Sequence, residues 1–263
     1  MCYLEAAGGT NTTVSSLSQC LMSGLTNQRK VASYDNTSGL CTLHDQETIL
    51  RPIDCSDVNP QCSTIIHKIT TKTGRCFNIL CDMDAEQGHW NVLHTRRNSS
   101  VDFFRNWSEY KTGFGDLTGN FWLGNENIHS MMVFSSYKLR IELEAWDGTV
   151  GIAEYSLFQI SSESDNYRLT IGGFSGNTSD GMDYVNGHVF TTKDRDNDKK
   201  LDGNCAIYRL GAWWYNACSH VNLNGRYKTD SGDDQASMCW KFFFANREHV
   251  PMRQARMLMK RYT

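Results

Sequence analysis

The chain has 263 residues, with 26 lysines and arginines against 29 aspartates and glutamates, so its formal net charge at pH 7 is -3. This length suits one large domain, or one domain with a small N-terminal appendage. The near balance of charge, without a long run of either sign, argues against nucleic acid or anionic lipid as a partner. No apolar stretch is long enough for a signal peptide after Met1 or for a membrane span elsewhere, so we expect a mature or excised fragment and no membrane partner.

Ten cysteines indicate that the chain folds in an oxidising compartment, because so many thiols are unusual in a reducing one. The absence of any CxxC pair disfavours a zinc ribbon or a thioredoxin-like site and favours disulfides. Asn-x-Ser/Thr triplets fit the glycosylated surface of an extracellular, secreted protein. They begin at Asn11, Asn36, Asn98, Asn106 and Asn177.

Residues 1–50 form a segment rich in Ser, Thr, Asn and Gly that carries Cys2, Cys20 and Cys41. Within it, residues 17–43 resemble half of a PAN/apple module, which would imply a Cys20–Cys41 bridge and an adhesive accessory role. An irregular linker held by cysteines fits this segment as well. We therefore predict an N-terminal segment at 1–50 and a main domain at 51–263.

Residues 63–69 and 75–81 are runs of β-branched and aromatic residues on either side of a glycine turn, which predicts a β-hairpin. Next, Asp102 is expected to cap a helix whose aromatic face repeats at Phe103, Trp107 and Tyr110. Residues 124–133 predict a second short helix.

Apolar and charged residues alternate at 139–145, and further runs at 153–160 and 167–171 follow at short spacing. The gaps are too short for βαβ crossovers, so the sheet should be antiparallel. From 172 to about 234 the chain is dominated by Gly, Asn, Asp and Ser, and a long irregular segment inside a domain usually carries the function.

Acidic residues alternate in this irregular segment at Asp194, Asp196 and Asp198. Carboxylates at this spacing are able to converge on one hard cation, and calcium is the natural candidate. The segment is not an EF-hand, because the sixth position of such a loop is Lys199 and the twelfth is Cys205. The spacing alone fits a metal site and a solvated acidic turn equally well.

Catalysis is not expected. Cys218 and His220 are too close in sequence to act as a nucleophile and its base, and the cysteine is expected to be oxidised. The chain has no HExxH zinc motif and no glycine-rich phosphate loop.

Several motifs occur in a fixed order: CDMD at 81–84, VDFFRNW at 101–107, FWLGNENIH at 121–129, DRDND at 194–198, NCA at 204–206 and GAWWY at 211–215. Together they resemble the fibrinogen C-terminal domain family, which includes ficolins, tachylectins and angiopoietins, from about residue 54 to 260. The resemblance implies an α+β fold with a central antiparallel sheet, short helices and a loop-rich, calcium-binding C-terminal part.

The resemblance also implies two disulfides, Cys55–Cys81 and Cys205–Cys218. By elimination, Cys62 and Cys76 would form a further rung across the predicted hairpin. Cys2 and Cys239 would then pair with each other or link chains.

For the metal, the resemblance implies calcium bound by the carboxylates of Asp196 and Asp198 and by main-chain carbonyls near Leu201 and Gly203. The loop is one residue longer than the common form. A ligand pocket would lie beside it, with Ala217-Cys218 at the place of a cis peptide bond in lectin-like members.

The walls of this pocket differ from the family pattern, since Ser219 follows the second cysteine, with His220 one place later, and Arg209 replaces an aromatic residue. We expect Arg209, Tyr227, Asp233 and Asp234 to form a more polar site instead.

These features predict a calcium-dependent, lectin-like protein of innate immune pattern recognition. Its partners would be glycans, acetylated or anionic, or glycoproteins on microbial or cell surfaces, and homo-oligomers would add avidity. The alternative is an extracellular adhesive or signalling ligand that binds a protein receptor.

Overall fold

The computed structural model describes residues 10–13, 30–35, 40–45, 52–58, 64–86, 88–230 and 232–262, the first three ranges as backbone only. The N-terminal part contributes a three-stranded antiparallel sheet of β1 (Thr10–Thr13), β2 (Lys30–Asp35) and β3 (Leu40–Asp45), in the order β1-β3-β2. Cys2, Cys20 and the side chain of Cys41 lie outside the described residues. The PAN/apple-like character of this segment, its bridge and the division at residue 50 therefore stay predictions.

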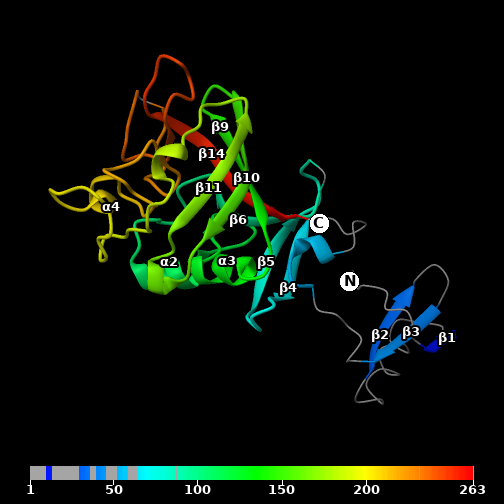
Figure 1. Ribbon diagram of the computed structural model, residues 1–263. Coiled ribbons are helices and arrows are strands. Elements are labelled where there is room, and N and C mark those ends of the chain that lie inside the picture. Colours follow the sequence, from blue (N-terminus) through cyan, green and yellow to red (C-terminus); the bar gives the residue numbers. More distant parts are fainter. Residues whose placement is uncertain are drawn as a thin grey trace.

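The main sheet is antiparallel throughout, with its long strands in the order β11-β10-β9-β14-β6-β5-β4 (Figure 1). These strands are β4 (Ile65–Thr70), β5 (Cys76–Asp82), β6 (Trp90–Arg96), β9 (Tyr137–Ala145), β10 (Val150–Ile160), β11 (Leu169–Gly176) and β14 (Val250–Arg261). The predicted hairpin is formed by β4 and β5, and the alternating segments are β9, β10 and β11. The α+β class and the antiparallel arrangement are thus confirmed.

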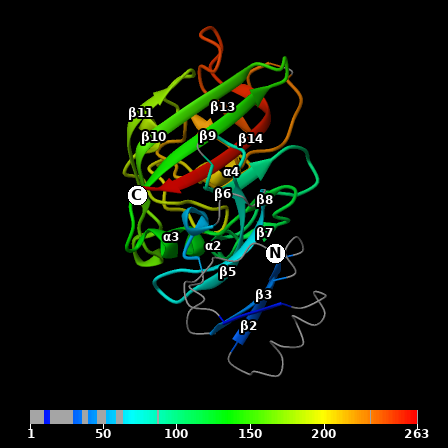
Figure 2. The same cartoon turned by 90° about the vertical axis from the view of Figure 1, so that its right-hand side faces the viewer.

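The last strand of the chain lies inside this sheet. β14 pairs with β9 on one side and with β6 on the other, as Figures 1 and 2 show for the red strand. The sequence reasoning did not predict this strand. Residues 177–249 therefore leave the sheet after β11 and return to it at β14, which makes the loop-rich lobe a long excursion between two strands of one sheet.

Short strands and helices fill the remaining connections. The strands are β7 (Phe114–Gly115), β8 (Phe121–Trp122), β12 (Val221–Asn222) and β13 (Cys239–Trp240). The helices are η1 (Cys55–Asp57), α2 (Trp107–Thr112), α3 (Asn125–Met132), η2 (Glu163–Asp165), η3 (Asp183–Val185) and α4 (Cys205–Tyr208). None of the helices in the described part of the chain has both the length and the apolar character to cross a bilayer.

α2 begins later than the sequence suggested. Its N-cap is Asn106, whose side chain accepts from the backbone N–H of Glu109 while the Glu109 carboxylate accepts from the N–H of Asn106. This reciprocal pair satisfies two N–H groups that a helix start otherwise leaves unbonded. The Asp102 carboxylate instead accepts from the N–H of Phe104 in the preceding turn, so its expected role as the cap was wrong. α3 lies where the second helix was predicted.

An aromatic cluster joins the lobe to the sheet and to α2. The ring of Phe190 in the lobe lies 5.1 Å from that of Trp214, 5.3 Å from Tyr110 of α2 and 6.1 Å from Trp122 of β8. The indole N–H of Trp214 also donates to the Tyr167 carbonyl at 2.7 Å. Buried aromatic contacts of this kind stabilise through their large apolar area and through ring geometry. The lobe therefore has a packed base, although it contains little regular secondary structure.

Two disulfides are present among the described residues. Cys55–Cys81 joins η1 to β5, and Cys205–Cys218 joins the start of α4 to the segment that precedes β12. Both are the pairs that the family resemblance implied.

The remaining described cysteines are free thiols, which corrects two expectations. Cys76 is exposed and lies opposite Thr70 at the turn end of the β4–β5 hairpin. Because its thiol is free, the expected bridge to Cys62, which is outside the described residues, is not formed. Cys239 is fully buried, and burial raises the pKa of its thiol to about 12. It is neither paired nor able to link chains.

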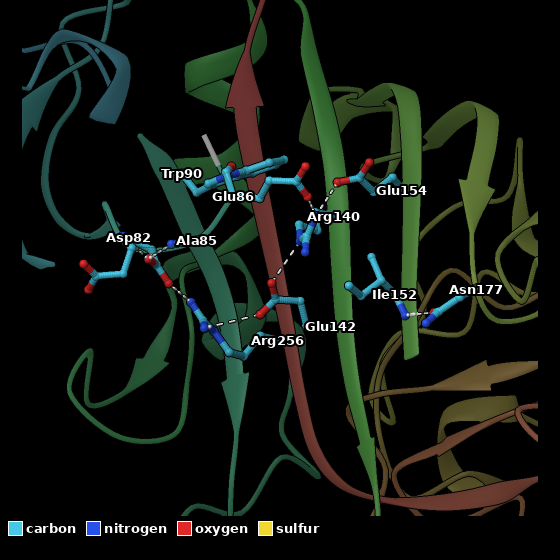
Figure 3. Close-up of polar contacts among 11 residues, drawn as sticks. Asp82, Ala85, Glu86, Trp90, Arg140, Glu142, Ile152, Glu154, Asn177 and Arg256 are labelled. Atoms are coloured by element: carbon cyan, nitrogen blue, oxygen red, sulfur yellow. Dashed lines mark hydrogen bonds and ion pairs between the residues drawn. The ribbon is translucent and has the colours of Figure 1, made fainter. Parts of the chain in front are cut away.

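A ladder of charged side chains runs across one face of the sheet (Figure 3). Arg256 of β14 reaches over β6 to Asp82 of β5 and also pairs with Glu142 of β9 at 3.3 Å. Arg140 of β9 binds Glu142 at 2.9 Å and Glu154 of β10 at 2.7 Å. Burial alone would raise the pKa of Asp82, but the Arg256 guanidinium and the N–H groups of Ala85 and Asp84 outweigh it, so this pKa is lowered.

Asp82 therefore adds stability that is complete above the unfolded-state pKa of an aspartate, about 3.9, and is lost as the pH falls from there through the lowered folded-state pKa. We expect Asp82→Asn to reduce the free energy of unfolding at pH 7 by roughly 1–3 kcal/mol, because the nearly buried Arg256 contact loses its anion. Urea unfolding between pH 2.5 and 7 measures this, and the acid-dependent part of the curve should become shallower.

Asp84→Asn is the matched control for this prediction. Asp84 follows β5 and accepts from the Thr64 hydroxyl at the surface, so its change should stay within about 0.5 kcal/mol. An acid profile of Asp82→Asn identical to that of the parent chain would contradict the assigned role of Asp82.

Candidate calcium and ligand-binding site

Two carboxylates meet in the loop that precedes α4. The N–H of Asp198 donates to the Asp196 carboxylate at 3.3 Å, and the Asp198 side chain is half-buried beside it. Burial, together with the neighbouring charge of Asp196, raises the pKa of Asp198. Two like charges held together in this way favour a cation between or beside them.

Hydrogen bonds connect this acidic loop to the disulfide segment. One oxygen of Asp198 accepts from the N–H of Cys205 at 2.8 Å, and the other accepts from the N–H of Lys200 at 2.8 Å. The N–H of Lys199 donates to the carbonyl of Asn216 at 2.9 Å. The acidic loop is therefore hydrogen-bonded to the chain at Cys205 and, two residues before Cys218, at Asn216.

The carbonyl ligands expected for calcium belong to Leu201 and Gly203. Gly203 has φ +94°, and a β-carbon there would lie 2.6 Å from the Tyr208 hydroxyl oxygen, so this position favours glycine. The Asp202 carbonyl accepts from that hydroxyl, while the carbonyls of Leu201 and Gly203 accept no hydrogen bond in the part of the chain described. Calcium takes six to eight oxygen ligands and readily combines carboxylates, carbonyls and water.

The donor set is a small one. Within the described residues, no group of three or more His, Cys, Asp or Glu side chains is placed to hold a metal. Asp194, the first aspartate of the motif, accepts instead from the N–H of Trp107 and from the Thr192 hydroxyl, so it secures the start of α2. A cation here would depend on Asp196, Asp198, main-chain carbonyls and water.

The segment beside the second cysteine presents main chain and one imidazole. The Ala217–Cys218 peptide bond is cis, and Ala217 is exposed. Ser219 is buried, and its hydroxyl donates to the carbonyl of Val221 at 2.6 Å. The ring of His220 stacks on Tyr184 at 4.3 Å. Ala217 and His220 are thus available to a ligand, whereas Ser219 is part of the support.

Arg209 does not form a wall of this site. Its side chain is only 7% exposed, and the guanidinium donates to the carbonyls of Ser219 at 3.1 Å and Gln235 at 3.2 Å. Burial lowers its pKa. The expected ligand contact is therefore replaced by a buried clamp that holds two segments of the lobe together.

The other members of the expected polar wall are also engaged elsewhere. The Tyr227 hydroxyl donates to the carbonyls of Arg97 and Arg253, and its ring meets Trp146 edge-on, so none of its contacts involves residues 217–220. Asp233 pairs with Arg247 at 3.0 Å. Asp234 pairs with Lys228 at 2.8 Å. The structure does not bring Arg209, Tyr227, Asp233 and Asp234 together as one wall.

Sequence reasoning missed three features near the site. Apolar side chains of the acidic loop and α4 are exposed to solvent. Leu201 is 97% exposed, Tyr208 55% and Ile207 50%. Asn204 caps the short helix α4, where its side chain accepts from the N–H groups of Ala206 and Ile207, and this asparagine was a local signal for the helix. Tyr184, which supports His220, comes from η3 and has no signal in the sequence around Cys218.

The surroundings of the histidines near the site favour the neutral form of their rings. Burial lowers the pKa of His220, and the charges of Lys241 and Arg209 lower it further. Burial and the same two cations lower the pKa of His249. A ligand at this face would therefore meet main-chain groups and an imidazole whose neutral form is favoured, beside the acidic loop.

The predicted glycosylation sites differ in their surroundings. Asn98 is exposed, and its side-chain oxygen accepts from Asn120 and from the N–H of Ser100. Asn106 is the helix cap described above, and Asn177 donates to the Val150 carbonyl at 3.4 Å (Figure 3 shows its contact with Ile152). Asn36 and the side chain of Asn11 lie outside the described residues. Glycosylation stays a prediction at all five positions.

Comparison with known proteins places these features in a family. The family model described as "Fibrinogen beta and gamma chains, C-terminal globular domain" matches residues 51–262. Human ficolin-3 is 38% identical over 214 residues, which are 80% of this chain and 70% of that protein. Mouse angiopoietin-related protein 7 is 47% identical over 152 residues, which are 57% of this chain and 44% of that protein.

Solved structures agree. The fibrinogen-like globe domain of human ANGPTL2 has a TM-score of 0.74 at 37% identity and covers 80% of this chain and 98% of its own. Lamprey fibrin D-dimer, complexed with the peptide ligand Gly-His-Arg-Pro-amide, has a TM-score of 0.72 at 30% identity, covering 79% of this chain and 73% of its own. On the motifs, the fold, the two disulfides and these matches, the chain belongs to the fibrinogen C-terminal domain family.

Proposed function

We propose that this chain is a secreted recognition module that binds glycans on microbial or cell surfaces in a calcium-dependent manner, as a lectin-like protein of innate immunity. The observation that carries the proposal is the facing pair of Asp196 and Asp198, connected through Cys205 and Asn216 to the segment at residues 217–220, where Ala217 is exposed. The relation to ficolin-3 supports the same assignment.

In this proposal calcium acts by ordering the loops. Bound between Asp196 and Asp198, it would offset the repulsion of the two carboxylates in a loop where Asp198 accepts from Cys205 and Lys199 donates to Asn216. A ligand then meets main-chain groups that are already in place, so less conformational entropy is lost on binding. The role is one of binding, without a bond-making step.

A second candidate is an adhesive or signalling ligand that binds a protein receptor. It is favoured by the exposed apolar side chains of Leu201, Ile207 and Tyr208 beside the acidic loop, because exposed apolar groups that cluster at one place are typical of protein contacts. The similarity to mouse angiopoietin-related protein 7 and to lamprey fibrin with its bound peptide also supports this reading. Homo-oligomers would raise the avidity of either function.

We expect calcium to raise the melting temperature by roughly 5–10 °C at a concentration 100 times its Kd, because a ligand that binds only the folded state stabilises it by mass action. The Asp196→Asn, Asp198→Asn double variant should lose this shift. Differential scanning calorimetry with calcium or with a chelator measures it.

Asp202→Asn is the matched control, because it removes one charge from the same loop at a side chain outside the proposed ligand set. Its calcium shift should equal that of the parent chain. Equal shifts in the parent and in the double variant would rule out this metal site.

Glycan arrays and receptor capture separate the two candidate functions. Ala217→Trp should abolish glycan binding by covering the surface at Ala217, while Ile207→Ser, outside the proposed calcium ligands, should keep it. Arrays are read with calcium and with chelator. A parent chain that is blank on every glycan in calcium, but captures a protein partner that acetylated sugars do not displace, would favour the receptor ligand instead.

A further inference from the structure

A cavity lies on a part of the molecule that includes no residue of the acidic loop. It has a volume of about 290 Å³ and is enclosed by the chain around residues 96–104, by Leu210 after α4 and by residues 225–227 after β12. Its apolar wall consists of Val101, Phe103, Phe104, Leu210 and the ring of Tyr227. None of Asp196, Asp198 or residues 217–220 lines it, so its chemistry is separate from that of the site described above.

A buried cation forms the polar end of this cavity. Arg96 is 1% exposed, and one of its terminal nitrogens donates to the carbonyls of Leu223 at 3.2 Å and Gly225 at 2.9 Å. Its guanidinium carbon lies 4.0 Å from the centre of the Phe103 ring. Its Nε is buried and has no hydrogen-bond partner among the described residues.

Arg96 is a buried side chain that keeps its positive charge. Burial lowers its pKa to about 10, so the side chain is still a cation at pH 7. In the described part of the chain, no carboxylate forms an ion pair with it, although such a pair is the common way in which a buried guanidinium is compensated. Two neutral carbonyls and a ring face satisfy only part of the five N–H groups of an arginine.

The other charged groups of the cavity leave a positive excess. Arg226 lies at the rim, 55% exposed, and its contact with Asp234 is long at 3.4 Å. Asp102 also lines the cavity, and one of its oxygens is occupied by the N–H of Phe104. Two cations against one anion favour an anionic guest. A guanidinium matches the geometry of a carboxylate, and the apolar wall suits a hydrocarbon group attached to it.

We propose that this cavity binds a carboxylate joined to an apolar or aromatic group, with the carboxylate toward Arg96 and Arg226 and the apolar group against Phe103, Leu210 and Tyr227. A small organic acid and the C-terminal residue of a peptide share this chemistry. The site makes the chain a receptor for two independent ligands, one at the acidic loop and one here.

The test uses 3-phenylpropionate as a probe of the full chain, with the neutral 3-phenylpropionamide as its isostere. Binding is followed by isothermal titration calorimetry and by amide chemical shifts near Phe103 and Tyr227. We expect saturable binding of the acid and at least tenfold weaker binding of the amide. A peptide that ends in a free phenylalanine carboxylate, compared with the same peptide amidated, tells a chain terminus from a free acid.

Two variants at the surface test the location without removing the buried Arg96. Ser99→Trp fills the mouth of the cavity and keeps the Asn98-x-Ser100 triplet, and Arg226→Gln removes the rim cation. Each variant should bind the acid at least fivefold more weakly than the parent chain, at an unchanged melting temperature. Arg97→Gln is the control, since Arg97 is exposed and does not line the cavity, and it should bind as the parent does.

The proposal is overturned if none of the acids binds saturably, if the amide binds as well as the acid, or if both Ser99→Trp and Arg226→Gln bind as the parent chain does. Binding should persist in a calcium chelator. Failure of the calcium or glycan experiments would therefore leave this result unaffected.

Discussion

The position of β14 is the constraint on which the rest of the structure depends. A strand that pairs with β9 and β6 holds the two halves of the main sheet together, and it is made by the last residues of the chain. The sheet is therefore complete only after the chain has passed through the lobe, residues 177–249, and formed β14. Both ends of the lobe are therefore attached to the same sheet.

Within the lobe, order comes from side chains more than from regular backbone pairing. Phe190 and Trp214 pack against Tyr110 and Trp122 outside the lobe, which fastens the lobe by apolar burial. Arg209 then ties Ser219 to Gln235 from within. Hydrogen bonds from a charged donor to carbonyls are stronger than those between neutral groups. Arg209 therefore connects two segments of the lobe through a single side chain.

Aspartates of similar sequence surroundings take different roles because their neighbours differ. Asp194 accepts from the first N–H of α2, whereas Asp196 and Asp198 face each other a few residues later. The difference follows from the lobe, which brings Asp194 against Trp107, whereas Asp198 is bonded to Cys205 of the disulfide segment. The two residues after α4 also have different roles. Arg209 holds the Ser219 carbonyl beside the acidic-loop site, whereas Leu210 lines the separate Arg96 cavity.

The sequence by itself determined the local elements and the family. Alternation and turn residues were sufficient for the β4–β5 hairpin, for α3 and for an antiparallel sheet, because these depend on neighbours within a few residues. The ordered motifs led to both disulfides. Tertiary structure alone decided the central place of β14, the free thiol of Cys76 and the inward direction of Arg209. Strand order, and the direction of a long side chain, depend on partners far along the chain: the acceptors of Arg209 lie 10 and 26 residues away, and no local pattern encodes them.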